Sequence, residues 1–157
     1  MDLILWRHAE AGDANGALAS SGLDMARELT PRGEKQARRM ATWLDRVLPE
    51  TARIYASPAL RCQQTAQALP RKFKTSALLA PLAAPEQVLE LTQWPDGKFA
   101  VVLIGHQPTL GQVAAKLLGM PEQECAIRKA SVWWLRWRER NGVLRAELMA
   151  VQAPDFL

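Results

Sequence analysis

Apolar and polar positions along the 157-residue chain follow two alternating periods. Short apolar runs typical of strands lie at residues 3–6, 53–57, 100–105, 131–137 and 143–151. Between these runs, apolar residues recur at helical spacing after starts at Thr30-Pro31, Ser57-Pro58, Pro85 and Pro108. The alternation predicts an α/β layered fold with a mainly parallel sheet. Because Asn141-Gly142 is a strong hairpin signal, we expect an antiparallel pair of strands at the C-terminal end.

Residues 9–28 interrupt this pattern, because their composition shifts to Ala, Gly, Ser, Asn and Asp. Such a stretch predicts a long mobile loop between Ala9 and Glu28. We see no internal repeat and no linker elsewhere in the chain. The predicted loop is therefore the one candidate for a flap over a functional site.

Length and composition favour a single domain over residues 1–157. No apolar run approaches the roughly 20 residues that cross a bilayer, and Arg7 and His8 interrupt the pattern of a signal peptide. We therefore expect a cytoplasmic protein with no membrane partner. The two cysteines, Cys62 and Cys125, can build no disulfide framework, and neither lies in a C-x-x-C pair that could hold zinc.

The charge balance favours anionic partners without naming one. The chain has 20 Lys and Arg against 16 Asp and Glu, which gives a net charge of +4. The basic residues are scattered over several predicted elements. Because a nucleic-acid surface shows a denser basic face with exposed aromatic residues, we expect no nucleic-acid partner.

Three predicted strand ends place reactive side chains next to the sheet. The first apolar run ends in Arg7 and His8, the second leads through Ser57 into a helix with Arg61 in its first turn, and the third ends in His106. The chain has no other histidine. Ligands of open α/β sheets bind outside the carboxyl ends of the strands. If these strands are parallel, two imidazoles and two guanidiniums meet at one edge.

Such a cluster requires an anion, because unpaired buried cations repel one another and are costly to desolvate. Guanidiniums bind phosphate oxygens bidentately, which makes phosphate the natural ligand of Arg7 and Arg61. Beside a bound phosphoryl group, a histidine can act as a covalent nucleophile. The sequence lacks the clustered Asp and His residues of metal phosphatases, so we predict no metal and no cofactor. Neither cysteine has an arginine at the Cys-x5-Arg spacing, which excludes a cysteine phosphatase.

Four blocks of sequence resemble, in the right order, the successive signatures of the histidine phosphatase superfamily, also called phosphoglycerate mutase-like. These blocks read "LILWRHAEA", "ELTPRGEKQA", "IYASPALRCQQTA" and "LIGHQPTLG". The compact length and the Arg-His-Ala-Glu-Ala form are similar to its small SixA-type phosphohistidine phosphatase branch. The resemblance implies a three-layer α/β/α sandwich in which His8 is phosphorylated during turnover. It also implies that Arg7, Arg61 and His106 bind the phosphate, and that phosphohistidine in a signalling phosphorelay protein is the substrate.

The general acid has no clear candidate in the sequence. Branches that act on ordinary phosphate esters commonly place an acid just after the second histidine, where this chain has Gln107. Ser57 receives no role. Glu10 and Asp13, in the first loop, and Glu86 and Glu90, in a predicted helix, receive none either. An alkoxide leaving group needs a proton donor, whereas a phosphohistidine protonated on its other ring nitrogen leaves as neutral imidazole. The missing acid therefore favours a labile P–N substrate.

The sequence thus predicts an enzyme that hydrolyses phosphohistidine on a signalling protein, and two alternatives stay open. One is a phosphomonoesterase or mutase with the same machinery and a small phosphorylated substrate, which a carboxylate within reach of the His8 site would favour. The other is a non-catalytic module that binds phosphate or phosphoproteins. The chain has no segment long enough to cap the pocket around a small molecule, so we expect an open site suited to a protein-borne substrate.

Overall fold

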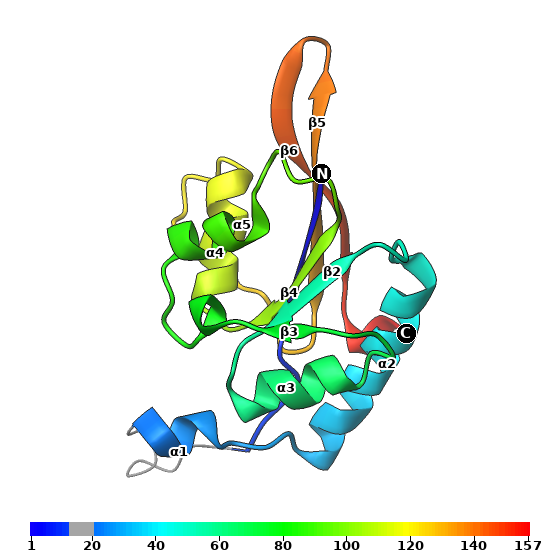
Figure 1. The fold of residues 1–157 in the computed structure, drawn as a ribbon, viewed down its shortest axis with the longest axis vertical. Coiled ribbons are helices and arrows are strands. Elements are labelled where there is room, and N and C mark those ends of the chain that lie inside the picture. The colour runs from blue at the N-terminus through cyan, green and yellow to red at the C-terminus, as the bar shows by residue number, and fades with distance from the viewer. Residues whose placement is uncertain (13–20) are drawn as a thin grey trace.

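A six-stranded sheet forms the centre of the computed structural model, which describes residues 1–12 and 21–157. The strand order is β3-β2-β4-β1-β5-β6 (Figure 1). The strands are β1 (Asp2–Arg7), β2 (Arg53–Ala56), β3 (Lys74–Thr75), β4 (Val101–Gly105), β5 (Val132–Arg140) and β6 (Val143–Gln152). Neighbours from β3 to β1 run parallel, and the pairs β1–β5 and β5–β6 run antiparallel. The prediction of a mainly parallel sheet with an antiparallel C-terminal pair is confirmed.

Helices cover both faces of the sheet, which gives the three-layer sandwich (Figure 1). One layer contains α2 (Pro31–Val47) and α3 (Leu60–Gln67), and the other contains α4 (Pro85–Thr92) and α5 (Thr109–Leu117). Strand β1 is apolar on both faces: Ile4 and Trp6 pack in the core beneath α2 and α3, whereas Leu3 and Leu5 pack beneath α4 and α5. A continuous apolar run is typical of a strand that is buried on both sides.

The helix starts follow the sequence signals with one correction. Thr30 is the N-cap of α2, as predicted, and its hydroxyl accepts the backbone N–H of Gly33 at 3.0 Å. The helix predicted from Ser57 begins later, at Leu60, because the Ser57 backbone N–H still bonds to β4, at the Ile104 carbonyl. Two short 3₁₀ turns, η2 (Ala77–Leu79) and η3 (Pro154–Phe156), follow β3 and β6 respectively.

The prediction of a loop between Ala9 and Glu28 is wrong in part. It contains the short helix α1 (Ser21–Met25), and Ala11 forms an isolated antiparallel bridge with Leu29. A five-residue helix is too short to show an amphipathic period, which is why the composition indicated a loop. Asp13 and the middle of the predicted flap lie outside the described residues.

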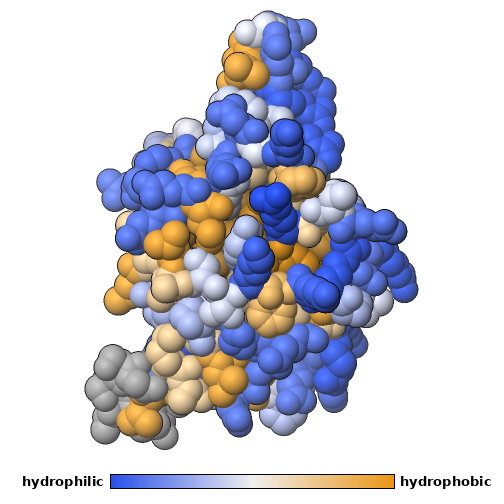
Figure 2. Space-filling model, in the orientation of Figure 1, coloured by the Kyte–Doolittle hydropathy of each residue, from blue (hydrophilic) through white to orange (hydrophobic). Residues whose placement is uncertain are grey.

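The surface is mixed in character. Figure 2 shows hydrophilic side chains over much of one face of the molecule, with smaller apolar areas between them. Within residues 1–12 and 21–157, the structure contains no helix with the length and apolar composition needed to span a membrane. The exposed apolar residues include several on β6, at the edge of the sheet.

Candidate active site

The carboxyl ends of β1, β4 and β2 meet at one edge of the sheet. Arg7 of β1 lies level with Gly105 of β4, so the residues that follow, His8 and His106, emerge side by side. Their ring centroids are 5.3 Å apart. Ser57 follows the neighbouring end of β2, and its backbone N–H bonds to the Ile104 carbonyl at 3.0 Å. The parallel sheet therefore brings together the two histidines that the sequence places far apart.

His8 is buried and held in one tautomer. Its Nδ1 lies 2.8 Å from the carbonyl oxygen of Ala9. Because a carbonyl can only accept, Nδ1 bears the hydrogen and Nε2 keeps its lone pair. Burial, with smaller contributions from His106, Arg61 and Arg7, lowers the pKa of His8 to about 3 against the opposing hydrogen bond to Ala9. His8 is therefore a neutral imidazole with a free ring nitrogen at physiological pH.

His106 has the opposite tautomer. Arg61 donates from Nη2 to Nδ1 of His106 at 3.2 Å, so Nε2 bears the hydrogen and donates to Ser57 Oγ at 2.7 Å. Burial and then the charge of Arg61 lower the pKa of His106 to about 3. The Cys62 thiol lies 3.5 Å from the same Nε2, but burial raises its pKa to about 12. That thiol is therefore no nucleophile at neutral pH, as the sequence indicated.

Two guanidiniums lie in the same region with unused donors. Arg7 donates from Nη1 to the Ile127 carbonyl at 2.7 Å, and Arg61 donates from Nη1 to the Asp24 carbonyl at 2.8 Å. Within the described residues, each arginine also has a buried Nε–H without a hydrogen-bond partner. A buried donor without a partner is costly unless a ligand satisfies it. The pair is suited to a tetrahedral oxyanion, which offers several acceptor oxygens.

Helix α1 and the segment just after it add two residues to the site that the sequence did not indicate, Asp24 and Arg27 respectively. The Asp24 carboxylate accepts hydrogen bonds from Arg61 Nη2 at 3.2 Å and from Arg27 Nε at 3.0 Å, while Arg27 Nη1 also reaches the Gly12 carbonyl. Desolvation raises the pKa of Asp24, but the charges and hydrogen bonds of Arg61 and Arg27 outweigh it, so the net pKa is lowered. Asp24 is thus a carboxylate rather than a proton donor. The i,i+3 spacing of Asp24 and Arg27 was the available signal, within a stretch whose composition resembles a loop.

Of the residues left without a role, Ser57 lies in the histidine cluster as the acceptor of the His106 Nε2–H, whereas Glu10 and Gln107 lie outside it. Glu10 accepts the Thr30 hydroxyl at 2.9 Å and so anchors the start of α2. Gly33 lets that helix approach, because a Cβ at this position would overlap the Glu10 carbonyl oxygen. Gln107 accepts the Gly111 N–H and donates to the Cys125 carbonyl, each at 2.7 Å. Neither Glu10 nor Gln107 is available as a catalytic acid.

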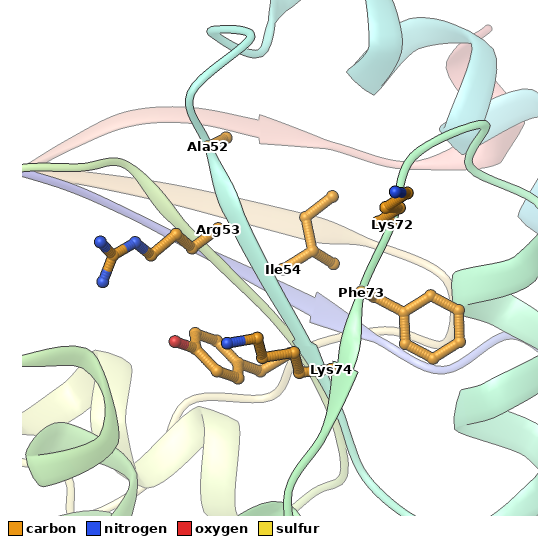
Figure 3. Close-up of a pocket in the computed structure, with 7 residues that line it drawn as sticks. Ala52, Arg53, Ile54, Lys72, Phe73 and Lys74 are labelled. Carbon is orange, nitrogen blue, oxygen red and sulfur yellow. The ribbon is translucent and has the colours of Figure 1, made fainter.

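The remaining candidate carboxylates Glu86 and Glu90, and a cavity beside β2, lie elsewhere. Glu86 pairs with Lys116 at 2.7 Å on α4 and α5, and Glu90 lines a groove on α4. A cavity of about 420 Å³ opens beside β2 (Figure 3). Its lining consists of residues 52–55 and 72–74, with Arg53, Lys72 and Lys74 around it. This cavity is separate from the strand ends that hold the histidines.

The sequence of the chain decides its family. The model described as "Histidine phosphatase superfamily (branch 1)" matches residues 3–82, which include His8 and Arg61. This chain belongs to the histidine phosphatase superfamily. The expected resemblance is confirmed, and the chain is a phosphatase.

Relatives and solved structures agree with this assignment. Phosphohistidine phosphatase SixA of Escherichia coli is 32% identical over 125 residues, which cover 74% of each chain. An uncharacterized protein of Picosynechococcus is 33% identical over 175 residues, covering 100% of this chain and 99% of the relative. A structure of the protein histidine phosphatase SixA complexed with tungstate superposes with a TM-score of 0.77 at 25% identity over 99% of each chain. The phosphatase therefore belongs to the SixA-type branch.

Metal ligands are scarce around the site of the phosphatase. Across residues 1–12 and 21–157, no three His, Cys, Asp or Glu side chains lie close enough together to hold a metal ion. The groups that act on the His8 imidazole are instead cationic or neutral, namely Arg7, Arg61, His106 and the Ala9 carbonyl. Such a set of donors fits an anionic ligand better than a cation.

Proposed function

We propose that this phosphatase hydrolyses phosphohistidine on a signalling protein through a phosphohistidine intermediate at His8. The most direct support is the hydrogen bond from His8 Nδ1 to the Ala9 carbonyl, which leaves Nε2 free. Arg7, Arg61 and His106 surround that imidazole, as a phosphate-binding site requires. The name of the E. coli relative, a phosphohistidine phosphatase, agrees with this substrate class. The tungstate bound to a SixA protein is likewise a tetrahedral oxyanion.

In the first step, Nε2 of neutral His8 attacks the phosphorus in line with the P–N bond of the substrate. A P–N bond to His8 forms while the substrate P–N bond breaks, and its electron pair leaves with the substrate imidazole. Because that ring has a proton on its other nitrogen, it departs as neutral imidazole. Arg7, Arg61 and His106 stabilise the charge on the equatorial oxygens.

In the second step, water attacks the phosphorus of phosphorylated His8. The P–N bond to His8 breaks, the electron pair returns to Nε2, and the proton lost by water passes to the phosphate product or to solvent. The hydrogen bond from Nδ1 to Ala9 stabilises the positive charge of the phosphorylated ring throughout. The chemistry is thus assigned to side chains, with no metal or cofactor taking part.

The proposed substrate class is supported by the lack of a proton donor beside His8 among residues 1–12 and 21–157. Asp24 is the carboxylate nearest to the cationic cluster among the described residues, and its pKa is lowered by Arg61 and Arg27 although desolvation opposes them. It is therefore deprotonated at neutral pH and gives no proton to an alkoxide. The leaving imidazole of a phosphohistidine needs no proton from the enzyme.

The cytoplasmic location expected from the sequence stays a prediction.

A comparison of two substrates tests the proposal. We expect kcat/KM for a phosphohistidine-bearing protein or peptide to exceed that for a simple alkyl phosphate by at least about 1,000-fold, since general-acid catalysis alone contributes roughly 10²–10⁴-fold. The His8→Ala variant should hydrolyse neither substrate. Equal or better use of the alkyl phosphate would favour the small-molecule phosphomonoesterase. Binding of phosphate or phosphopeptides with no turnover would favour the non-catalytic module.

A further inference from the structure

The strand β6 is an exposed edge with an apolar surface. It is the last strand of the sheet, and it pairs with β5 on one side. Its exposed apolar residues are Val143, Leu144, Leu148, Met149 and Val151. The hairpin formed by β5 and β6 projects beyond the helices at the end of the molecule away from α3, and Figure 2 shows hydrophobic atoms on it. A long apolar edge strand has unpaired backbone N–H and C=O groups that can bind another strand.

We propose that β6 pairs with β6 of a second copy of this chain, in antiparallel orientation about a two-fold axis, which joins the two sheets into one. Residues that lie opposite each other in such a pair point to the same face of the joined sheet. Because side chains alternate between the two faces along a strand, the numbers of two opposite residues must be both odd or both even. Only a few registers are therefore available. The charged residues of β6, Arg145 and Glu147, distinguish between them.

One register matches every side chain of residues 144–148 with a suitable partner. When Ala146 faces Ala146 of the second copy, Arg145 faces Glu147 of the second copy, and the reverse pair forms by symmetry. Leu144 then faces Leu148 of the second copy. Two of the exposed apolar residues of β6, Leu144 and Leu148, are covered in this way in each copy. Opposite charges and apolar pairs directly across from each other stabilise a sheet.

The neighbouring registers are unfavourable. Centring the pair on Arg145 places two arginines opposite each other, and centring it on Glu147 does the same with two glutamates. Like charges directly opposite are destabilising. The favoured pairing also ends where β6 becomes irregular. Within one chain, Leu148 of β6 faces Leu135 of β5 and Ala150 faces Trp134, so Met149 is an extra residue in β6. The sequence of β6 thus specifies its own copy rather than any extended strand.

The monomer accommodates this pairing without loss of the catalytic site. Within one chain, Glu147 already has Arg138 at 3.3 Å and Arg140 at 3.7 Å, besides Arg145 at 3.6 Å. Arg145 can therefore turn to the second copy while Glu147 keeps cationic neighbours. Strand β5 runs antiparallel to β1, so the hairpin turn lies at the end of the sheet opposite to His8. Two-fold pairing leaves both histidine clusters open.

Sedimentation velocity over a micromolar concentration series tests the pairing. The decisive experiment compares two charge-reversal variants with their mixture. We expect the wild type to form a dimer, and Arg145→Glu or Glu147→Lys to weaken dimerisation at least about tenfold, since each creates two like-charge pairs. An equimolar mixture of the two variants should dimerise again, because both charge pairs are then complementary. Leu144→Asp, at a position 60% exposed, should also weaken the dimer while leaving the monomer folded.

The controls separate pairing from folding and from net charge. Arg38→Glu on α2 changes the net charge as Arg145→Glu does, and its side chain is 61% exposed away from β6, so this variant should dimerise normally. Thermal unfolding by circular dichroism verifies that each variant folds. Phosphatase activity should be unchanged in Arg145→Glu. A wild type that stays monomeric at high concentration, or a mixture that does not dimerise, would overturn the proposal.

Discussion

The two ends of the central sheet place the same residue type in opposite environments. At the carboxyl ends of β1, β2 and β4, the Arg61 side chain is only 4% exposed and touches His106 and Asp24. At the far end, Arg140 and Arg145 on the hairpin are 60% and 57% exposed, and they share the carboxylate of Glu147. Water and salt screen the hairpin charges, whereas burial strengthens the interactions of Arg61. The proposed role of Arg61 as a phosphate ligand therefore depends on its surroundings, rather than on its charge alone.

The largest expected difference between the two ends is in catalysis. Arg61→Lys keeps the charge but removes the fork that binds two oxygens, so kcat/KM for phosphohistidine should fall about 10²–10³-fold. The matched variant Arg145→Lys should change it less than about twofold, because surface substitutions have small effects. Steady-state kinetics on both variants measure the difference. Similar losses in the two variants would contradict the assignment of the phosphate site.

The pH dependence of stability should also depend on the buried end. The unfolded chain protonates its histidines near pH 6.5, whereas in the folded chain burial lowers the pKa of His8 and of His106 to about 3. The unfolded state therefore binds more protons between these values, and the free energy of unfolding should decrease as the pH falls through this window. Urea unfolding at several pH values should show a shallower decrease for His8→Ala than for the wild type. If the free energy of unfolding decreased equally with pH in both proteins, His8 would not be a buried neutral group.

A smaller effect is expected from the residue that orients His106. Ser57→Ala removes the acceptor of the His106 Nε2–H bond at 2.7 Å, which frees the ring to rotate. We expect kcat to fall about tenfold with KM little changed, in line with the energy of one hydrogen bond. Ser57→Thr, which keeps the hydroxyl, should recover part of the activity. An unchanged kcat in Ser57→Ala would assign Ser57 to the turn before α3 alone.

The smallest expected effect concerns the base of the hairpin. Asp2 accepts hydrogen bonds from Arg136 at 2.6 and 2.7 Å and from the Trp134 indole at 3.1 Å, so it ties β5 to β1. Asp2→Asn should cost about 1 kcal/mol of stability, a value reduced by solvent screening of the half-exposed Arg136. Chemical denaturation measures this loss, and activity should be retained. A large loss of activity would show that the two ends of the sheet are coupled.

Most of the candidate active site could be predicted because its residues follow strands. Apolar runs before His8 and His106 identify buried strands, and parallel neighbours bring their carboxyl ends to one edge. Arg61 follows from the same logic, since α3 begins just beyond β2. These positions depend on hydrophobic periodicity, which the sequence contains directly.

The remaining features depend on contacts between distant segments. Helix α1 has only five residues, so no period indicates it, and the ion pair of Asp24 with Arg61 is invisible until the chain folds. The tautomers of His8 and His106 depend on Ala9, Ser57 and Arg61. The strand β3 has two residues and owes its existence to β2. Tertiary structure, rather than local propensity, determines each of these features.

Trapping of the intermediate tests the central claim most directly. A substrate protein bearing labelled phosphohistidine is mixed with the phosphatase, the reaction is stopped under conditions that preserve P–N bonds, and the labelled residue is located by mass spectrometry. We predict that the label appears on His8 at early times and then passes to inorganic phosphate, and that His8→Ala acquires none. Normal turnover without labelled protein, or with the label on another residue, would contradict a covalent role for His8.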